Sequence, residues 1–552
     1  MEERQIEEKG IDRRAFLSGA GGLAAVGLIG ALSGCAPKSS EQPDESERSS
    51  SSGSNDTEGY AWETPPEPIT NITRTVETEV LVIGGGIAGC CTACSAAENG
   101  LQVKLVEKTE GLGLRTYVFG ASNSRMMEQQ NSTVDKAFAQ EEWNRTCGNR
   151  ANEKLVTKFM DASPDAINWV LDKADANGAL TILSGNHATK SKTYPEAQCA
   201  HMVLSMIDGV MQPDINAVGN WMRADAEAKG AEFIFNSPAV QLVQDGAKVV
   251  GAICETEEGY VQYNASKAVV LATGDIGGNL DMVKAYAPIA APLVENGRNI
   301  YFPIGANTGD GLKMGLWVGA QLPNLPLPTM MHPQQYCQMS PGCFPAVNYE
   351  GERFFNEGIW MQGRTLNIMK QTDYSCYWIL DSNWHDYYLE SLEAGGGGVF
   401  WDGFEDKDAA MGQIQGYIDS KMAWQADTLE DLATAMDVDP ATFKATMDRY
   451  NGFCAAGEDA DFRKPVEQLK PAKDGPFIGL KVGASLLTVP GSLKVNVDSQ
   501  VLNKDEGVIE GLYAVGNVQG ELFANDYPLY IVGCSHGRCI TFGYELGKYL
   551  SA

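Results

Sequence analysis

Three closely spaced glycines are the clearest chemical signal in the sequence. Gly84, Gly86 and Gly89 have the spacing G-x-G-x-x-G, directly after the apolar stretch 79–83 and before a run of small residues through position 97. In a strand–turn–helix unit of this kind, the first glycine permits a tight turn and the second lets the backbone approach a pyrophosphate. The third lets the helix pack on the strand, and the helix N-terminus faces the phosphates. The pattern therefore predicts a dinucleotide site.

An acidic residue follows at the distance that such a site requires. Glu107 ends the expected strand 101–106 and lies 18 residues beyond Gly89, close to the roughly 20 expected for a carboxylate that binds a ribose hydroxyl. The following loop, from Lys108 to Asn123, is rich in glycine and hydroxyl groups, as expected where backbone donors approach phosphate. Alone, the glycine pattern would fit an NAD site or an empty turn. The strand, helix and acid make it specific.

Later stretches return the chain to the same site. Residues 267–274 and 511–517 each read as a strand that ends in a glycine turn, and residues 533–537 lead into a last helix. The N-terminus of that helix could stabilise an anionic reduced flavin. Asp310 either caps the helix that follows it or faces the cofactor. The expected cofactor-binding residues are Gly84, Gly86, Ile87, Ala88, Gly89, Glu107, Lys108, Gly113, Gly120, Ala121, Ala239, Thr273, Gly274, Asp310, Gly516, Asn517, Cys534 and Ser535.

The elements that position these residues need a large chain, and the length of 552 residues predicts two domains. The net charge of −30 argues against nucleic acid or an anionic membrane surface as a partner. The thirteen cysteines show neither zinc nor haem spacing, and no metal is expected. Cys90, Cys91 and Cys94 read as small buried apolar residues. An iron–sulfur cluster at Cys337, Cys343, Cys534 and Cys539 remains a hypothesis that their spacing does not predict.

The N-terminus reads as an export signal followed by a tether. Arg13 and Arg14 precede an apolar stretch at 19–34 that is too short to span a membrane and matches a twin-arginine signal. Cys35 closes a lipobox-like sequence, so we expect a lipid anchor there; the alternative is simple cleavage. The polar run after Cys35 predicts a flexible linker, and nothing before about Arg74 is expected to be folded.

Several blocks together resemble the fumarate reductase and succinate dehydrogenase flavoprotein superfamily, with its urocanate reductases, 3-ketosteroid dehydrogenases and cardiac glycoside reductase type. They are VIGGGIAG, LATGDIGGN, NTGDGLKMG, VNYEGERFFNE, GLYAVGN and the pair His332-Pro333. The resemblance covers roughly residues 76–552 and implies non-covalent FAD in an α/β fold, whose Rossmann-like FAD-binding domain is interrupted by an α+β capping domain. The expected segments are a signal at 1–35, a disordered linker at 36–74, FAD-binding parts at 75–324 and 486–552, and the capping domain at 325–485.

The resemblance also implies a set of charged substrate ligands, and this sequence departs from it. Family members that reduce fumarate bind two carboxylates with histidines and arginines, and an arginine delivers the proton. His332 matches the first histidine, whereas Met361, Thr488 and Asp526 occupy positions where the family has cationic residues. Losing these cations removes bidentate recognition of a dicarboxylate, which argues against fumarate and succinate. Arg364 is the nearest substitute for the proton donor.

A tyrosine offers a different chemistry at the C-terminal block. Tyr527-Pro528 looks like the Tyr-Pro segment that polarises a ketone in ketosteroid dehydrogenases. A tyrosine hydroxyl, with a reference pKa of about 10, can donate a hydrogen bond to a neutral carbonyl. Tyr527 is therefore the expected electrophile, with Tyr530 and His332 as further polar candidates. The alternatives are a core tyrosine and a buried, satisfied histidine.

These features predict an exported enzyme that reduces an activated C=C bond of an α,β-unsaturated carbonyl compound by hydride transfer from flavin N5, in anaerobic respiration. Export argues against NADH as the electron donor, so we expect a membrane or surface cytochrome, which an acidic surface could guide if the carrier is basic. Two alternatives stay open. One is oxidation by a ketosteroid dehydrogenase-like enzyme, and the other is a flavin protein that transfers electrons without turnover.

Overall fold

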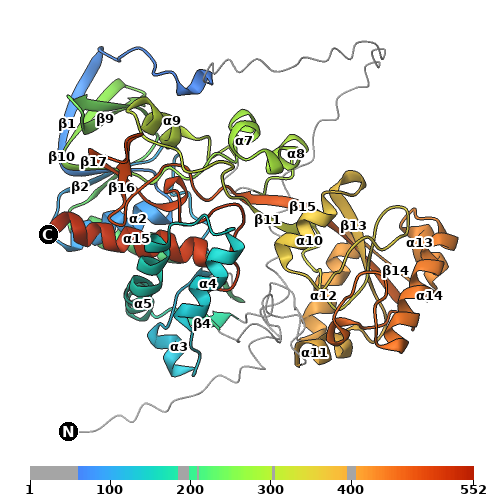
Figure 1. Ribbon diagram of the computed structural model, residues 1–552. Coiled ribbons are helices and arrows are strands. Elements are labelled where there is room, and N and C mark those ends of the chain that lie inside the picture. Colours follow the sequence, from blue (N-terminus) through green and yellow to red (C-terminus); the bar gives the residue numbers. More distant parts are fainter. Residues whose placement is uncertain (1–59, 185–197, 208–209, 301–304, 394–405) are drawn as a thin grey trace, which may run out of the picture.

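The computed structural model describes residues 60–184, 198–207, 210–300, 305–393 and 406–552 (Figure 1). The expected signal sequence and Cys35 lie outside the described residues. None of the helices in the described part of the chain has the length and apolar composition that a membrane crossing needs.

The first sheet has a mostly parallel core. Strand β1 (Ile72–Ile83) pairs in parallel with β2 (Val103–Val106) and β10 (Gly259–Leu271). Residues 80–83 are all buried, because a parallel strand is covered on both faces. The order is β16-β17-β10-β1-β2-β7, and β8 and β9 extend it beside β10. The remaining strands are β7 (Glu232–Ile234), β8 (Ala239–Asp245), β9 (Lys248–Thr256), β16 (Gln500–Leu502) and β17 (Val508–Ala514).

Two helices from opposite ends of the chain cover this sheet in successive layers. Helix α2 (Ile87–Glu98) is made of small residues and is buried at every position except Glu98. Helix α15 (Cys534–Ser551) packs on it (Figure 1). The approach is close at Gly543 and Gly547, where an added Cβ would press on the backbone of α2. Small residues on both helices therefore allow the C-terminus to close over the glycine turn.

A smaller sheet and several helices complete this part of the molecule. The sheet has the order β3-β5-β4, with β6 beside β5. Its strands are β3 (Phe119–Gly120), β4 (Leu180–Ser184), β5 (Ala200–Ile207) and β6 (Val210–Pro213). The helices are α3 (Arg125–Gln129), α4 (Lys136–Thr146), α5 (Glu153–Ala176), α6 (Ala217–Ala228), α7 (Leu280–Tyr286), α8 (Ala291–Glu295) and α9 (Asp310–Trp317).

A second, antiparallel sheet forms a separate body beside the first (Figure 1). Its order is β11-β15-β13-β12, with β14 beside β15, and it has its own apolar cluster around Ile379 and Phe443. The strands are β11 (Met330–Tyr336), β12 (Ala346–Val347), β13 (Ser375–Leu380), β14 (Ala423–Ala426) and β15 (Phe477–Thr488). The helices are α10 (Met361–Ile368), α11 (Trp384–Glu393), α12 (Lys407–Asp419), α13 (Leu429–Ala435) and α14 (Pro440–Ala456).

The fold class expected from the sequence is confirmed, since an α/β body with a Rossmann-like sheet is interrupted by an α+β body. We call the second body the cap. Its strands run from Met330 to Thr488, against an expected capping domain at 325–485. The exact boundaries at 324, 325, 485 and 486 stay predictions.

The expectation that nothing before Arg74 is folded was wrong. Residues 61–63 form a short 3₁₀ turn, and β1 already begins at Ile72. The indole nitrogen of Trp62 donates to the hydroxyl of Tyr286 at 3.0 Å, and Trp317 donates to the carbonyl of Trp62 at 2.8 Å. Residues 60–74 therefore belong to the folded part of the chain, because these hydrogen bonds hold the aromatic side chain of Trp62 on α7 and α9.

Candidate active site

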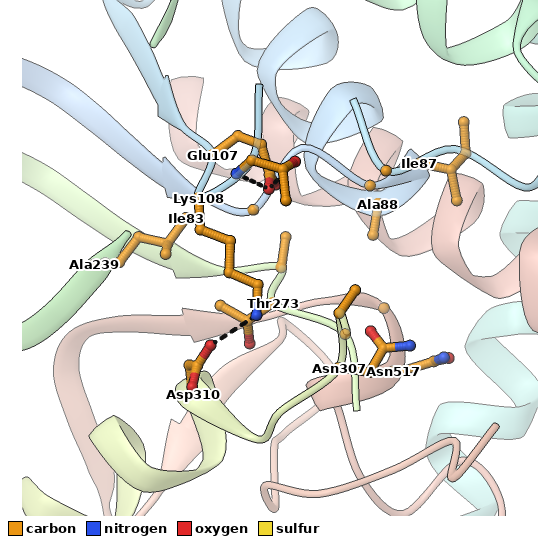
Figure 2. Close-up of a pocket in the computed structure, with 18 of the residues that line it drawn as sticks. Ile83, Ile87, Ala88, Glu107, Lys108, Ala239, Thr273, Asn307, Asp310 and Asn517 are labelled. Carbon is orange, nitrogen blue, oxygen red and sulfur yellow. Dashed lines mark hydrogen bonds and ion pairs between the residues drawn. The ribbon is translucent and has the colours of Figure 1, made fainter. Parts of the chain in front are cut away.

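A cavity lies where the carboxyl ends of β1, β2 and β10 meet the N-terminus of α2 (Figure 2). About 1090 Å³ of space outside protein atoms lies within it, a volume that includes the solvent at its open mouth. Many of the cofactor-binding residues expected from the sequence line it. They are Gly84, Gly86, Ile87, Ala88, Glu107, Lys108, Gly113, Ala239, Thr273, Gly274, Asp310, Gly516, Asn517 and Ser535.

The three glycines of the turn have different neighbours. Gly84 has a φ of +111°, which L side chains rarely adopt, and Gly89 packs against the carbonyl of Gly84 with no room for a Cβ. Gly86 is the N-cap of α2, and no side chain caps the helix there. A Cβ on Gly86 would meet only the carbonyl oxygen of Gly113, at 3.9 Å. The helix N-terminus and the space before it are thus open to an anionic ligand.

Glu107 holds the turn in this shape. One carboxylate oxygen accepts the backbone N–H of Gly85 at 2.6 Å, and the other accepts the N–H and hydroxyl of Thr109 at 2.9 and 2.8 Å. Three of the about four acceptor sites of a carboxylate are thereby used inside the protein. Glu107 also lines the cavity, so its contact with a ribose stays a prediction that this geometry permits.

A charged pair crosses the cavity mouth between β2 and α9. The ammonium of Lys108 donates to Asp310 at 3.1 Å and to Thr308 at 3.0 Å (Figure 2). Gly309 is the N-cap of α9 and no side chain caps that helix, so Asp310 faces the cavity and does not act as the cap. Burial alone would raise the pKa of Asp310, but the ammonium groups of Lys108 and Lys313 outweigh it and lower that pKa.

Behind the cavity lies a buried polar network that the sequence did not reveal. The amide nitrogen of Asn517 donates to Asp275 at 3.0 Å and to the hydroxyl of Thr488 at 2.7 Å, while its oxygen accepts Arg538 at 2.5 Å. Thr488 in turn donates to Asp275 at 2.5 Å. This network ties the end of β15 in the cap to the cavity wall. Thr488 is therefore engaged with a carboxylate at a position where the family resemblance implies a cation.

The first turn of α15 forms another part of the cavity wall. Its N-cap, Gly533, is left-handed and no side chain caps the helix, while Ser535 and His536 line the cavity. His536 lies 2.9 Å from the carbonyl of Val118, and burial, followed by the charge of Arg115, lowers its pKa to about 4. Sequence reasoning missed the lining residues Arg115, Asn307, His536 and Cys539. The helix start at 533–537, which the sequence did single out, contains one of them, His536.

Four of the expected cofactor-binding residues do not line the cavity. Gly89 packs within the turn, and Gly120 packs its backbone on the start of α15, where a Cβ would meet Val532. Ala121 is fully buried and donates its N–H to Cys199. Cys534 is buried against Tyr527. Gly89 thus has the packing role expected of the third glycine, whereas Gly120, Ala121 and Cys534 were expected at the cofactor and have packing contacts instead.

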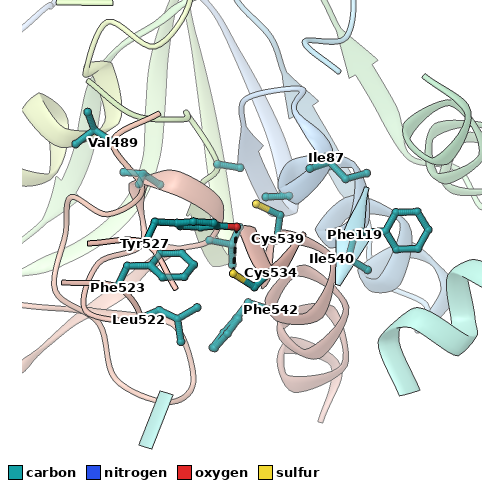
Figure 3. Packing of buried hydrophobic residues seen from close by; sticks show 14 of the residues in the cluster. Ile87, Phe119, Val489, Leu522, Phe523, Tyr527, Cys534, Cys539, Ile540 and Phe542 are labelled. Carbon is teal, nitrogen blue, oxygen red and sulfur yellow. Dashed lines mark hydrogen bonds between the residues drawn. The ribbon is translucent and has the colours of Figure 1, made fainter. Parts of the chain in front are cut away.

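Tyr527 lies in the core (Figure 3). Its side chain is almost fully buried beside Phe523, and its hydroxyl accepts the N–H of Ser535 at 2.9 Å and lies 3.0 Å from the thiol of Cys534. Burial raises the pKa of Tyr527 well above its ordinary value. The structure does not bring this residue to the cavity, and it corresponds to the core tyrosine that the sequence left open.

The other three catalytic candidates are also buried away from the cavity lining. His332 lies on β11, where burial lowers its pKa to about 3 and keeps the imidazole neutral. Tyr530 packs edge-on against Phe138, and burial raises its pKa to about 12. Arg364 lies within the cap and is described next.

Arg364 is a structural cation of the cap. Its guanidinium donates to the carbonyl of Ile359 at 2.9 Å and to that of Ser340 at 2.5 Å. The group is 2% exposed, and burial lowers its pKa to about 10. These bonds point it into the cap, so the expectation that Arg364 replaces the proton donor finds no support in its placement.

The cysteines named as a possible cluster site do not converge. Within the described ranges, the residues whose ligand atoms come close enough for a metal are Cys94, Glu98 and Asp225. The ammonium of Lys173 lies between these acids, 2.7 Å from Glu98 and 2.5 Å from Asp225. A cation of the chain itself therefore neutralises this group.

Solved structures with this architecture include an open flavocytochrome c3 fumarate reductase and a 3-ketosteroid-Δ4-(5α)-dehydrogenase from Rhodococcus jostii. Both give a TM-score of 0.64 over 87% of this chain, and they cover 79% and 98% of those chains at 23% and 22% identity. At this identity the likeness shows the fold alone.

Relatives of known activity span most of the chain. The vinyl phenol reductase of Lactiplantibacillus plantarum is 25% identical over 85% of this chain and 96% of its own length. Two proteins of Eggerthella lenta also match: a urocanate reductase, 26% identical over 87% and 75%, and a digoxin reductase, 23% identical over 99% and 98%. The sequence model of the FAD binding domain matches residues 79–529, more than half of the chain. The chain therefore belongs to the FAD binding domain family, as an FAD-dependent oxidoreductase of the fumarate reductase-like superfamily.

Proposed function

We propose that this protein is an exported FAD-dependent reductase that saturates the C=C bond of a neutral α,β-unsaturated carbonyl compound. The proposal is carried by a dinucleotide cavity together with Met361, Thr488 and Asp526 at positions where the family resemblance implies the cations that clamp a dicarboxylate. Relatives named as reductases of vinyl phenol, urocanate and digoxin support reduction of unsaturated compounds in general.

The residues of the cavity fit FAD. The open N-terminus of α2 at Gly86 would hold the pyrophosphate, and the free acceptor site of Glu107 would hold a ribose hydroxyl. The uncapped first turn of α15, at Ser535 and His536, would face the flavin ring and favour negative charge on it. When bound and reduced, FAD supplies a hydride from N5. The protein must then position the alkene, polarise its carbonyl and exclude water.

The substrate end argues for a neutral molecule. Thr488 is bonded to the carboxylate of Asp275, and Asp526 places a further carboxyl where a cation would be needed. Arg364 is turned into the cap. A second carboxylate on the substrate would meet acidic groups in place of the bidentate arginines that such recognition uses.

The route of electrons and the location follow from the N-terminal sequence. Arg13-Arg14 would send the folded holoprotein through the twin-arginine route, and lipidation of Cys35 would hold it at the membrane surface. An external cytochrome is then the donor. Lysine at both Arg13 and Arg14 should leave the protein in the cytoplasm, and Cys35→Ala should release it from membranes. A double variant that still reaches the envelope would contradict export by this route.

Anaerobic reoxidation of the flavin tests the activity. The purified holoprotein is reduced chemically without air, and enones, enoate esters, unsaturated lactones and fumarate are added while flavin absorbance is followed. We expect reoxidation by neutral carbonyl compounds and little by fumarate, with reduced free FAD as the control. If no alkene reoxidises the flavin, the protein is an electron carrier without turnover. Steroid-dependent reduction of an artificial acceptor would instead favour the dehydrogenase.

A further inference from the structure

Asp526 is held rigidly in a tight turn between the C-terminal segment and the cap. Asn525 has a left-handed φ of 57°, which asparagine tolerates better than most residues. The N–H of Asp526 donates to the carbonyl of Ala524 at 2.6 Å. Its carboxylate oxygen Oδ1 accepts the N–H of Tyr527 at 2.7 Å. The direction of the carboxyl is thus fixed by its own backbone.

The next residue anchors this turn to the cavity wall. The hydroxyl of Tyr527 accepts the N–H of Ser535, and Ser535 lines the cavity at the first turn of α15. The backbone of Tyr527 thus binds the carboxylate of Asp526, and its side chain binds the cavity wall at Ser535, where the flavin ring would lie. Its buried hydroxyl thus has a structural partner in the backbone of Ser535.

A buried amide from the cap lies beside the same carboxyl. Gln362 is on α10 and only 1% exposed, and its amide is close enough to the carboxyl of Asp526 to oppose, by hydrogen bonding, the rise in pKa that burial causes there. Neither polar atom of Gln362 has a hydrogen bond of normal length and angle among the described residues. Buried amides are normally satisfied, because an unmade hydrogen bond destabilises the folded state. An unsatisfied amide next to a carboxyl, on opposite sides of the junction between the two bodies, indicates a place for a polar ligand.

The groups around Asp526 leave its carboxyl without a counter-charge. Cys147, at the end of α4, donates its thiol to the backbone carbonyl of Asp526 at 3.7 Å. The guanidinium of Arg150 binds the side-chain oxygen of Asn525, at 2.7 Å. No ion pair to Asp526 occurs in the described part of the chain. Burial raises the pKa of Asp526 to about 6, against the opposing effects of Tyr527 N–H and Gln362.

We propose that Asp526 is the proton donor of the reduction and that Gln362 donates a hydrogen bond to the substrate carbonyl. The inference rests on the proposed function and deepens it, because this pair selects a neutral carbonyl compound. The other candidates are occupied: Arg364 binds cap carbonyls, and Tyr527 is linked to α15. His332 stays neutral, which leaves it no proton to give as an imidazolium.

The reaction balances with one hydride and one proton. Bound, reduced FAD would supply the hydride for the carbon β to the carbonyl and would be oxidised by two electrons as the alkene is reduced by two. The O–H bond of Asp526 breaks as a C–H bond forms at the α carbon. The carboxylate that remains takes a proton from water before the next turnover.

The first test compares Asp526→Asn with Asp505→Asn, a change at an exposed carboxyl. Each reduced holoprotein is mixed without air with methyl cinnamate or 2-cyclohexenone, and flavin reoxidation is followed between pH 5 and 8. We expect the wild type and the Asp505 variant to slow as pH rises above about 6, as the acid loses its proton. Asp526→Asn should be at least about 100-fold slower, with no such pH dependence. Wild-type rate and pH profile in Asp526→Asn would overturn the assignment while leaving the proposed function intact.

The second test needs no turnover. Methyl cinnamate and cinnamate share one alkene and differ in charge, and their binding to the oxidised protein is read from the flavin spectrum. We expect tighter binding of the ester, and reversal of this preference in Asp526→Arg that retains flavin. Gln362→Leu should weaken ester binding about tenfold while raising the urea midpoint, because leucine removes an unsatisfied buried amide. Equal binding of both ligands, no binding of the ester, or a lower midpoint with unchanged affinity would refute the pair as a carbonyl site. If no alkene reoxidises the wild type, the proposed function fails, and these binding results still decide the carbonyl site.

Discussion

The FAD cavity and the Asp526–Gln362 pair differ in how far their polar groups are hydrogen-bonded within the protein. In the cavity, the carboxylate of Glu107 accepts three hydrogen bonds from Gly85 and Thr109, and the helix that the glycine turn opens offers an uncapped N-terminus. At the junction with the cap, two side chains from distant parts of the sequence meet, and the amide has no partner. A cofactor site can therefore be specified by a local motif, whereas a substrate site depends on which side chains the tertiary structure brings together.

The cap has a third arrangement, in which one cluster of buried charges is paired. Within the VNYEGERFFNE block, Arg353 pairs with Glu357 at 2.8 Å and with Asp459 at 3.0 Å. Lys464 adds a contact to Glu357 at 3.2 Å, and both of these side chains are completely buried. This block was part of the family resemblance, and its charges hold the cap together and are not available to a ligand.

The largest effect is expected from a single methyl group added at Gly89, within the local motif that forms the cavity. In Gly89→Ala the new Cβ would overlap the carbonyl oxygen of Gly84, so the turn must open. We expect at least about tenfold less flavin per protein, measured from visible absorbance against protein absorbance. Gly111→Ala is the matched control, since a Cβ there meets nothing within 4 Å. Normal flavin content in Gly89→Ala, with unchanged circular dichroism, would show that the turn does not set cofactor binding.

A second prediction concerns the paired charges of the cap. Glu357→Ala leaves Arg353 and Lys464 buried without their shared partner, which costs about 3–5 kcal/mol. Urea unfolding should show the loss, and the control Glu458→Ala removes only an exposed pair with Arg463.

The same network gives a pH dependence with a definite sign. Burial would raise the pKa of Glu357, but Lys464 and Arg353 outweigh it and lower that pKa. A lowered folded-state pKa contributes stability above the unfolded value of about 4.3 and loses it as pH falls through the folded value. The difference between wild type and Glu357→Ala should therefore shrink below about pH 4. A constant difference down to pH 2 would contradict the charge-pair explanation.

The sequence predicted the first sheet and most of the cavity lining because each signal lies within about 20 residues of chain. The sequence-based prediction was wrong where the same residue type can serve either packing or ligand binding. Gly120 and Gly86 look alike in sequence, yet Gly120 packs on α15 and Gly86 faces the cavity. Tyr527 was expected at a substrate, but its partner Ser535 could be found only from the fold.

The substrate side was predicted least well, for the same physical reason. Arg364 carries the charge expected of a proton donor. Only the tertiary structure shows that its guanidinium is hydrogen-bonded to two backbone carbonyls of the cap. At the N-terminus, polar composition predicted a linker through residue 74, and the aromatic contacts of Trp62 with α7 and α9 overrode it. Contacts between side chains that lie hundreds of residues apart produce no short sequence motif from which they could be predicted.

A smaller loss of FAD affinity is expected from a change at Glu107 and would define the role of this residue. Glu107→Gln keeps the shape of the side chain but replaces a charged acceptor of the Gly85 and Thr109 N–H groups. Hydrogen bonds to charged groups contribute about 1.5–3 kcal/mol, so FAD affinity should fall roughly 10- to 100-fold. Titration of the apoprotein with FAD measures it, and Glu110→Gln, in the same loop, is the control. Equal affinity in Glu107→Gln would show that the turn keeps its shape without this charge.

The smallest effect is expected at the cavity mouth, where Lys108 and Asp310 are each 31% exposed. Asp310→Asn removes the partner of Lys108 and Lys313, and solvent screening limits the loss to about 1 kcal/mol or less. Because the pKa of Asp310 is lowered, its contribution is present above the unfolded value near 4 and disappears as pH falls through the folded value. Urea unfolding at pH 7 and pH 3 should show a small difference from wild type that vanishes in acid and shrinks in 1 M salt. The exposed pair Lys444–Asp448 provides the control through Asp448→Asn. A larger loss of unfolding free energy in Asp310→Asn that persists at pH 3 and in 1 M salt would contradict the ion-pair explanation. It would mean that Asp310 stabilises the cavity wall by packing, as Gly89 does in the glycine turn.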